Sequence, residues 1–170
     1  NVAELIPYLG FLLFRIPLAL TPIQALSIDM GSDTLSSLGL GVERPAPKVM
    51  LRPPRPRDER LMNWPLAFRA YVFLGLIEAS AAMAAFFFVL HAAGWEYGEN
   101  LATDDPLYLQ ATTACLSTII VMQVVNVFLC RSPERPAYSG VLANRLLLAG
   151  IGTEVVLILL IDGKSLGAPI

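Results

Sequence analysis

The chain has 170 residues, of which 55% are hydrophobic and 15% are charged, and its mean hydropathy is +0.61. A soluble domain carries about 25% charged residues, so this composition excludes an ordinary soluble domain and favours a membrane protein. The formal net charge of −2 decides little, because the positions of the charges along the chain matter more than their sum.

Five apolar segments follow one another along the chain. A helix needs about 20 residues to cross a hydrocarbon core of about 30 Å. The first segment is shorter than that and is expected to be the second half of a helix whose beginning is missing, and the two prolines that follow it, Pro17 and Pro22, predict a tight turn. The fold class is therefore all-α, a polytopic transmembrane helix bundle in one domain. Its predicted spans are residues 2–14, 22–42, 66–91, 107–130 and 141–161.

Charges between the spans set the expected orientation. Lys and Arg gather in the segments 43–65 and 131–140, whereas the segment 92–106 carries acids and neither Lys nor Arg. The positive-inside rule predicts that the two basic loops are cytoplasmic and that the acidic loop is extracytoplasmic. The short basic loop with its regularly placed prolines does not suit a nucleic-acid patch, so no nucleic-acid partner is expected.

The second span carries two carboxylates near its middle, Asp29 and Asp33. A charged side chain at the centre of a membrane helix costs at least about 2.5–3.5 kcal/mol, so an acid at this depth predicts a functional site. Helical spacing places Asp29, Ser32 and Asp33 on one face. Such a face can hold a hard cation or a proton.

Other polar residues fall at membrane depth. Asn1 and Glu4 share a helical face in the first segment, and Gln123 and Asn126 share one in the fourth. The amides could equally serve to tie helices together, and Glu154 has the same two interpretations. Glu78, flanked by alanine and serine, is interpreted instead as a packing or hydrogen-bonding residue.

Several motifs in order resemble the membrane domain of type II P-type cation-transporting ATPases, from the second half of their fifth helix to their ninth. They are an Asn-x-x-Glu helix, a turn flanked by prolines, an Asp-x-x-Ser-Asp helix, and a loop that ends in Val-Met-x-Arg-Pro-Pro-Arg. The motifs occupy residues 1–7, 16–24, 28–33 and 38–55, and the similarity extends over essentially the whole chain.

The resemblance implies a cation-binding site and its residues. In that family, the matching positions bind the transported ions. They are Asn1, Glu4, Asp29, Ser32 and Asp33, with Glu4, Asp29 and Asp33 as carboxylate ligands of the ion. Asp29 resembles the sodium/potassium and proton/potassium branch, where calcium pumps have Asn. Gln123, Asn126 and Glu154 match further polar positions of that branch, although Asn126 stands where sodium/potassium pumps have Asp, which puts a complete third sodium site in doubt.

The resemblance also implies an enzyme whose catalytic parts lie elsewhere. The Asp-Lys-Thr-Gly-Thr phosphorylation motif is absent from this sequence, so the chain alone is expected to be inactive, with no catalytic residue and no bound cofactor. The parent enzyme would use ATP and Mg2+, and its partners would be membrane lipid, the missing N-terminal part of the same pump, and a cation, with Na+, K+ or H+ favoured over Ca2+. A multi-pass protein of the plasma membrane is expected.

Two other functions remain open from the residues. One is an ATP-independent secondary transporter or channel that uses the same acids as a cation or proton relay. No inverted repeat is visible to support it, and the first apolar segment is only half as long as a span. The other is a purely structural helical fragment, which would leave the buried acids unexplained.

Overall fold

The computed structural model describes residues 2–43, 45, 49–51, 53, 54, 56, 62–131 and 144–166. Regular structure within these residues is entirely helical, which confirms the predicted all-α fold class. Two helical segments in this part of the chain are long and apolar enough to cross a membrane, Trp64–Ala92 and Pro106–Cys130. The fold is therefore consistent with the predicted helical membrane bundle.

The helices follow the apolar segments of the sequence, and two of the long helices contain a wider π-helical turn. The helix Trp64–Ala92, for example, consists of α4, η3 and α5 without a break. The elements in chain order are α1 (Val2–Phe14), α2 (Pro22–Ile28), η1 (Asp29–Asp33), α3 (Thr34–Gly41), η2 (Val49–Leu51), α4 (Trp64–Ala67), η3 (Phe68–Leu74), α5 (Gly75–Ala92), α6 (Pro106–Arg131) and α7 (Arg145–Leu166).

Polar caps fix where three of the helices begin. At the start of α2, the backbone N–H of Gln24 donates to Thr21 Oγ1 at 3.3 Å, and the backbone N–H of Thr21 donates to Gln24 Oε1 at 2.9 Å. This capping box satisfies two backbone donors that a helix start leaves without partners. Asn63 and Asn144 cap α4 and α7 with one bond each, because their side-chain oxygens accept from the backbone N–H groups of Leu66 and Leu147. These helices therefore begin at Trp64 and Arg145, a few residues away from residues 66 and 141, where the predicted spans begin.

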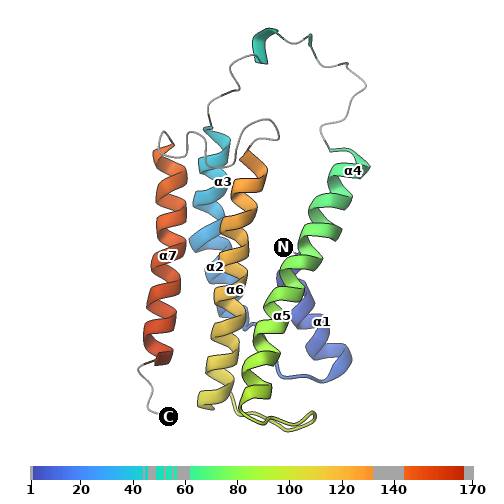
Figure 1. Cartoon of the computed structure of the whole chain (residues 1–170), viewed down its shortest axis with the longest axis vertical. Coiled ribbons are helices and arrows are strands. Elements are labelled where there is room, and N and C mark those ends of the chain that lie inside the picture. The colour runs from blue at the N-terminus through green and yellow to red at the C-terminus, as the bar shows by residue number, and fades with distance from the viewer. Residues whose placement is uncertain are drawn as a thin grey trace.

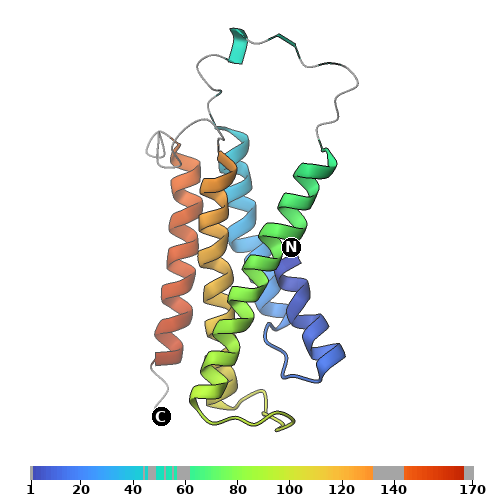
Figure 2. The same cartoon turned by 45° about the vertical axis from the view of Figure 1, so that its right-hand side comes forward.

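The long helices run side by side and alternate in direction. In Figures 1 and 2, α1, α5 and α7 run one way, and α2, α3 and α6 run the other way. The most extensive packing is between α5 and α6, followed by α3 against α7 and α1 against α5. The α4 end of its helix leans away from α6 in both views. The buried core lies between α5 and α6 and includes Leu20 and Ile28 from the α1–α2 segment.

Close glycine contacts show how α3 meets α7. A Cβ atom added to Gly39 would lie 2.8 Å from the Leu147 Cα and 2.9 Å from its backbone nitrogen. A Cβ added to Gly150 would lie 3.0 Å from Ser36 Oγ. The backbones of the two helices therefore touch, as is typical of membrane helices that pack through small residues. Asn144 adds a hydrogen bond to the same contact, because its Nδ2 donates to the carbonyl oxygen of Gly39 at 2.8 Å.

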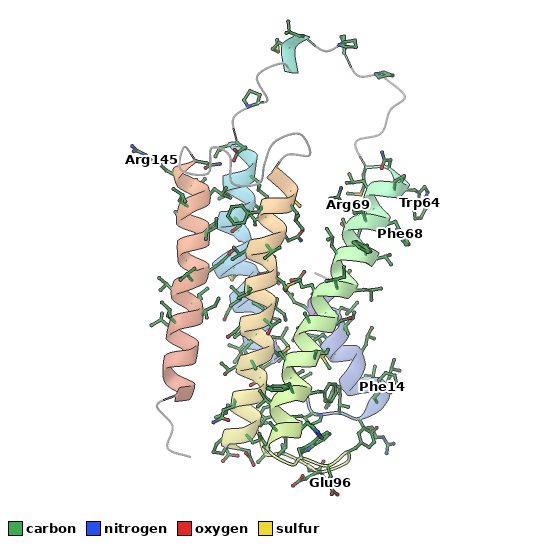
Figure 3. All side chains as sticks on the ribbon, viewed as in Figure 1. Phe14, Trp64, Phe68, Arg69, Glu96 and Arg145 are labelled. Atoms are coloured by element: carbon green, nitrogen blue, oxygen red, sulfur yellow. The ribbon has the colours of Figure 1, made fainter. Side chains whose placement is uncertain are left out.

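Charged residues lie at both ends of the bundle, and the basic and acidic ones labelled in Figure 3 are at opposite ends. Figure 3 shows Arg69 and Arg145 at one end, together with Trp64, and Glu96 at the other end in the loop between α5 and α6. Tyr97 lies in that loop as well, and both it and Trp64 are mostly exposed. Exposed aromatic residues at both ends are typical of the interfaces of a membrane protein.

Candidate cation site between α1, η1, α5 and α6

Three carboxylates from distant parts of the chain converge on one point. Glu4 of α1 is 7% exposed, and Asp29 and Asp33 stand at the two ends of η1. One oxygen from each of these residues can be chosen so that all three lie within 4.8 Å of one another. Carboxylate oxygens at this separation suit a hard cation, because a bound positive charge offsets the repulsion between them.

A π-helical turn carries the two aspartates. Residues Asp29–Asp33 adopt this wider turn, and the Thr34 hydroxyl donates to the carbonyl oxygen of Asp29 at 3.0 Å. Gly31 lies inside the turn, and a Cβ added there would lie 3.2 Å from Leu157 Cδ1 of α7. Single π turns inside α-helices occur frequently at functional sites. The sequence predicted one regular helix here, so the wider turn is a feature that the structure adds.

A cavity of about 190 Å³ adjoins the carboxylates. Its walls come from α1, η1, α3, α5 and α6, and they carry acids, amides and hydroxyl groups. The described residues that line it are Ala3, Glu4, Asp33, Ser36, Ser37, Leu40, Glu78, Gln123, Asn126, Val127 and Cys130. The cavity therefore brings acids, amides and hydroxyl groups together between helices that are otherwise mainly apolar.

The structure brings most of the predicted site residues together. Gln123 and Asn126 of α6 line the same cavity as Glu4 and Asp33, and Cys130 Sγ donates to Asn126 Oδ1 at 3.7 Å. Asn1 and the side chain of Ser32 lie outside the described residues. Their predicted role as ion ligands therefore stays a prediction.

Glu154 is not among the described residues that line the cavity, and it lies on α7, which packs against α3. Its side chain on α7 is completely buried, and Ser36 Oγ donates to its Oε1 at 2.6 Å. Glu154 Oε2 is also buried, and it has no hydrogen-bond partner among the described residues. Because Ser36 itself lines the cavity, Glu154 is connected to the cavity through the Ser36 hydroxyl.

The sequence interpretation did not place Glu78 or Ser36 at the site. It treats Glu78 as a packing or hydrogen-bonding residue, and the structure places Glu78 in the wall of the cavity with Glu4 and Asp33. The signal that could have found it is its charge, since an ionisable group at membrane depth without a basic neighbour predicts function. For Ser36, whose partner lies 118 residues away, the sequence offers no comparable signal.

Comparison with known proteins shows the family of this chain. Residues 17–162 match the sequence model of the family described as "Cation transporting ATPase, C-terminus". The human "Potassium-transporting ATPase alpha chain 2" is 28% identical, with 95% of this chain and 18% of the relative covered. The "Sodium/potassium-transporting ATPase subunit alpha" of Drosophila melanogaster is 29% identical, with 92% of this chain and 18% of the relative covered.

The chain thus spans a little under a fifth of the length of these relatives. The matched residues of this chain include α2, η1 and every described helix after them, as far as residue 162 of α7. It includes both aspartates of the carboxylate cluster and both amides of the cavity. The chain belongs to the family of cation-transporting ATPases, of which it represents the C-terminal membrane region.

Proposed function

We propose that this chain is the ion-transport part of an ATP-driven pump for a monovalent cation, and that Glu4, Asp29 and Asp33 bind the transported ion. The observation that carries the proposal is the approach of the three carboxylates to within 4.8 Å of one another. Asn1 and Ser32 complete the proposed ligand set from the neighbouring positions. Family membership favours the pump over an ATP-independent transporter.

The cavity lies on the proposed ion pathway. Gln123 and Asn126 offer amide oxygens from α6, and such hard ligands suit Na+ or K+. Glu154 acts on this pathway through Ser36. The named relatives transport potassium, or sodium and potassium, which supports a monovalent ion over Ca2+.

Transport requires two states with different affinity for the ion. In the proposed mechanism, α1 moves relative to η1, which changes the distance from Glu4 to Asp29 and Asp33 and thereby changes the affinity. A ligand shifts such an equilibrium only through its different affinity for the two states. The phosphorylation site, the ATP and the Mg2+ belong to the rest of the pump, and the five helical passes would lie in the plasma membrane.

The proposal is tested by Asp33→Asn in the full-length pump. We expect cation-stimulated ATP hydrolysis and the cation-dependent change in phosphoenzyme level to be lost, because the amide removes one of three converging charges. Asp104→Asn, in the exposed loop between α5 and α6, is the matched control and should behave as wild type. Unchanged cation stimulation in the Asp33 variant would show that the proposed site is wrong.

The nature of the ion is tested separately. Phosphoenzyme of the wild-type pump is titrated with sodium, potassium and calcium at several pH values. A response to sodium, potassium or pH is expected. A response to micromolar calcium alone would overturn the monovalent assignment.

A further inference from the structure

Glu78 of α5 forms part of the cavity wall. It is half-buried and lines the same space as Glu4 of α1 and Asp33 of η1. The cavity therefore has a carboxylate on three different elements, and one of these elements, α5, contributes no residue to the cluster of Glu4, Asp29 and Asp33.

The packing of α5 against α1 explains this position. A Cβ added to Gly75 would lie 2.9 Å from Val2 Cβ, and a Cβ added to Gly10 would lie 3.8 Å from Met83 Cε. Both pairs are separated by 73 positions, so the two helices run parallel in a fixed register. The same offset places Glu78 level with Leu5, next to Glu4. Because Gly75 precedes Glu78 by three residues, both lie on the helix face that meets α1.

The side chains that line the cavity include three acids. None of the described residues that line it is Lys, Arg or His, whereas Glu4, Asp33 and Glu78 are acids. Carboxylates grouped at low dielectric repel one another unless a positive charge or a proton offsets them. The amide groups of Gln123 and Asn126 on α6 add neutral oxygen ligands to the same space.

We propose that Glu78 faces the transported cation and sets the affinity of the pump for it. The proposal rests on the proposed function and extends its site from α1 and η1 to α5. Glu78 adds a negative charge to the cavity from a helix that packs against α1, so a cation in the cavity is held between α5, α1 and η1. Loss of that charge lowers the affinity for the cation without removing the three converging carboxylates.

The experiment compares Glu78→Gln with wild type in the full-length pump. The change keeps the size of the side chain and removes its charge. We measure the sodium and potassium concentrations that give half of the maximal effect on phosphoenzyme level, and the binding of radioactive sodium and rubidium. For the transported ion, the half-maximal concentration should rise about tenfold, which is the order expected for the loss of one nearby charge. The maximal phosphoenzyme level should stay unchanged.

Three variants make the result decisive. Glu96→Gln, in the exposed loop, should leave every titration unchanged. Glu78→Asp keeps the charge and should stay closer to wild type than Glu78→Gln; equal impairment of both would indicate a packing role and contradict the proposal. Asp33→Asn separates the two hypotheses: if it abolishes the cation response while Glu78→Gln changes nothing, the inference is wrong and the proposed function stands. If Asp33→Asn has no effect, the proposed function fails, and the role of Glu78 fails with it.

Discussion

The hydrogen bond from Ser36 to Glu154 ties α3 to α7 through two side chains that are 3% and 0% exposed. Ser36→Ala leaves Glu154 Oε1 buried without this donor. An unsatisfied buried polar group costs about 1–3 kcal/mol, although hydrogen bonds between membrane helices are often weaker. We expect a lower midpoint of thermal inactivation for the full-length protein in detergent.

A double variant tests whether the bond itself is responsible. Ser36→Ala combined with Glu154→Met removes both partners, so it should destabilise less than Ser36→Ala alone. Ser80→Ala, on an exposed face of α5, is the control for loss of a serine. The interpretation would be refuted if Ser36→Ala were as stable as the Ser80 variant.

At the scale of the elements, the contact between α3 and α7 depends on small residues. Gly39→Ala would place a methyl group less than 3 Å from the Leu147 backbone, so the two helices would have to separate. A cost of about 1–3 kcal/mol is expected for such overpacking. The thermal midpoint should fall, and the fall should exceed that of an alanine placed where space is free.

Gly152 supplies that comparison. It lies in α7, and a Cβ added there meets no atom within 4 Å. Gly152→Ala should therefore keep or raise stability, since alanine favours a helix interior by about 1 kcal/mol over glycine. Equal stability of the Gly39 and Gly152 variants would show that the backbones of α3 and α7 do not touch in the protein.

The accuracy with which the sequence predicts helix boundaries also differs between elements. Apolar runs predicted α1, the continuous helix Trp64–Ala92 and α6 to within about two residues, because burial in a bilayer requires long apolar segments. The Asn144 cap, rather than the apolar run, determines where the described part of α7 begins. The π turn at Asp29–Asp33 has no local signal of its own.

The candidate site was predictable in part for the same reason. Charge at membrane depth and helical spacing singled out Glu4 in the first segment and Asp29 and Asp33 in the second, and the structure places their oxygens together. The position of Glu78 depends on the register between α1 and α5, which are more than 60 residues apart in sequence. Its role could not be inferred until that register was known.

At the scale of the whole molecule, the separation of charges predicts the orientation in the membrane. Arg69 and Arg145 lie at one end and Glu96 at the other (Figure 3). In a full-length protein with Cys115→Ala and Cys130→Ser, Pro56→Cys should react with a membrane-impermeant thiol reagent only after cells are permeabilised. Asp104→Cys should react in intact cells. The opposite pattern would reverse the topology and contradict the positive-inside assignment.

The acidic segment from α2 to α3 also bears on how the protein is assembled during synthesis. Two strongly apolar helices, Trp64–Ala92 and Pro106–Cys130, separate it in sequence from α7. On insertion scales, an aspartate at a helix centre opposes entry into the bilayer by about 2.5–3.5 kcal/mol, and the segment from α2 to α3 carries two. Its main packing partner, α7, begins about 100 residues later. At about 5–20 residues per second, the ribosome needs roughly 5–20 s to deliver that partner. The acidic segment must be sheltered for this time by the insertion machinery or by α5 and α6.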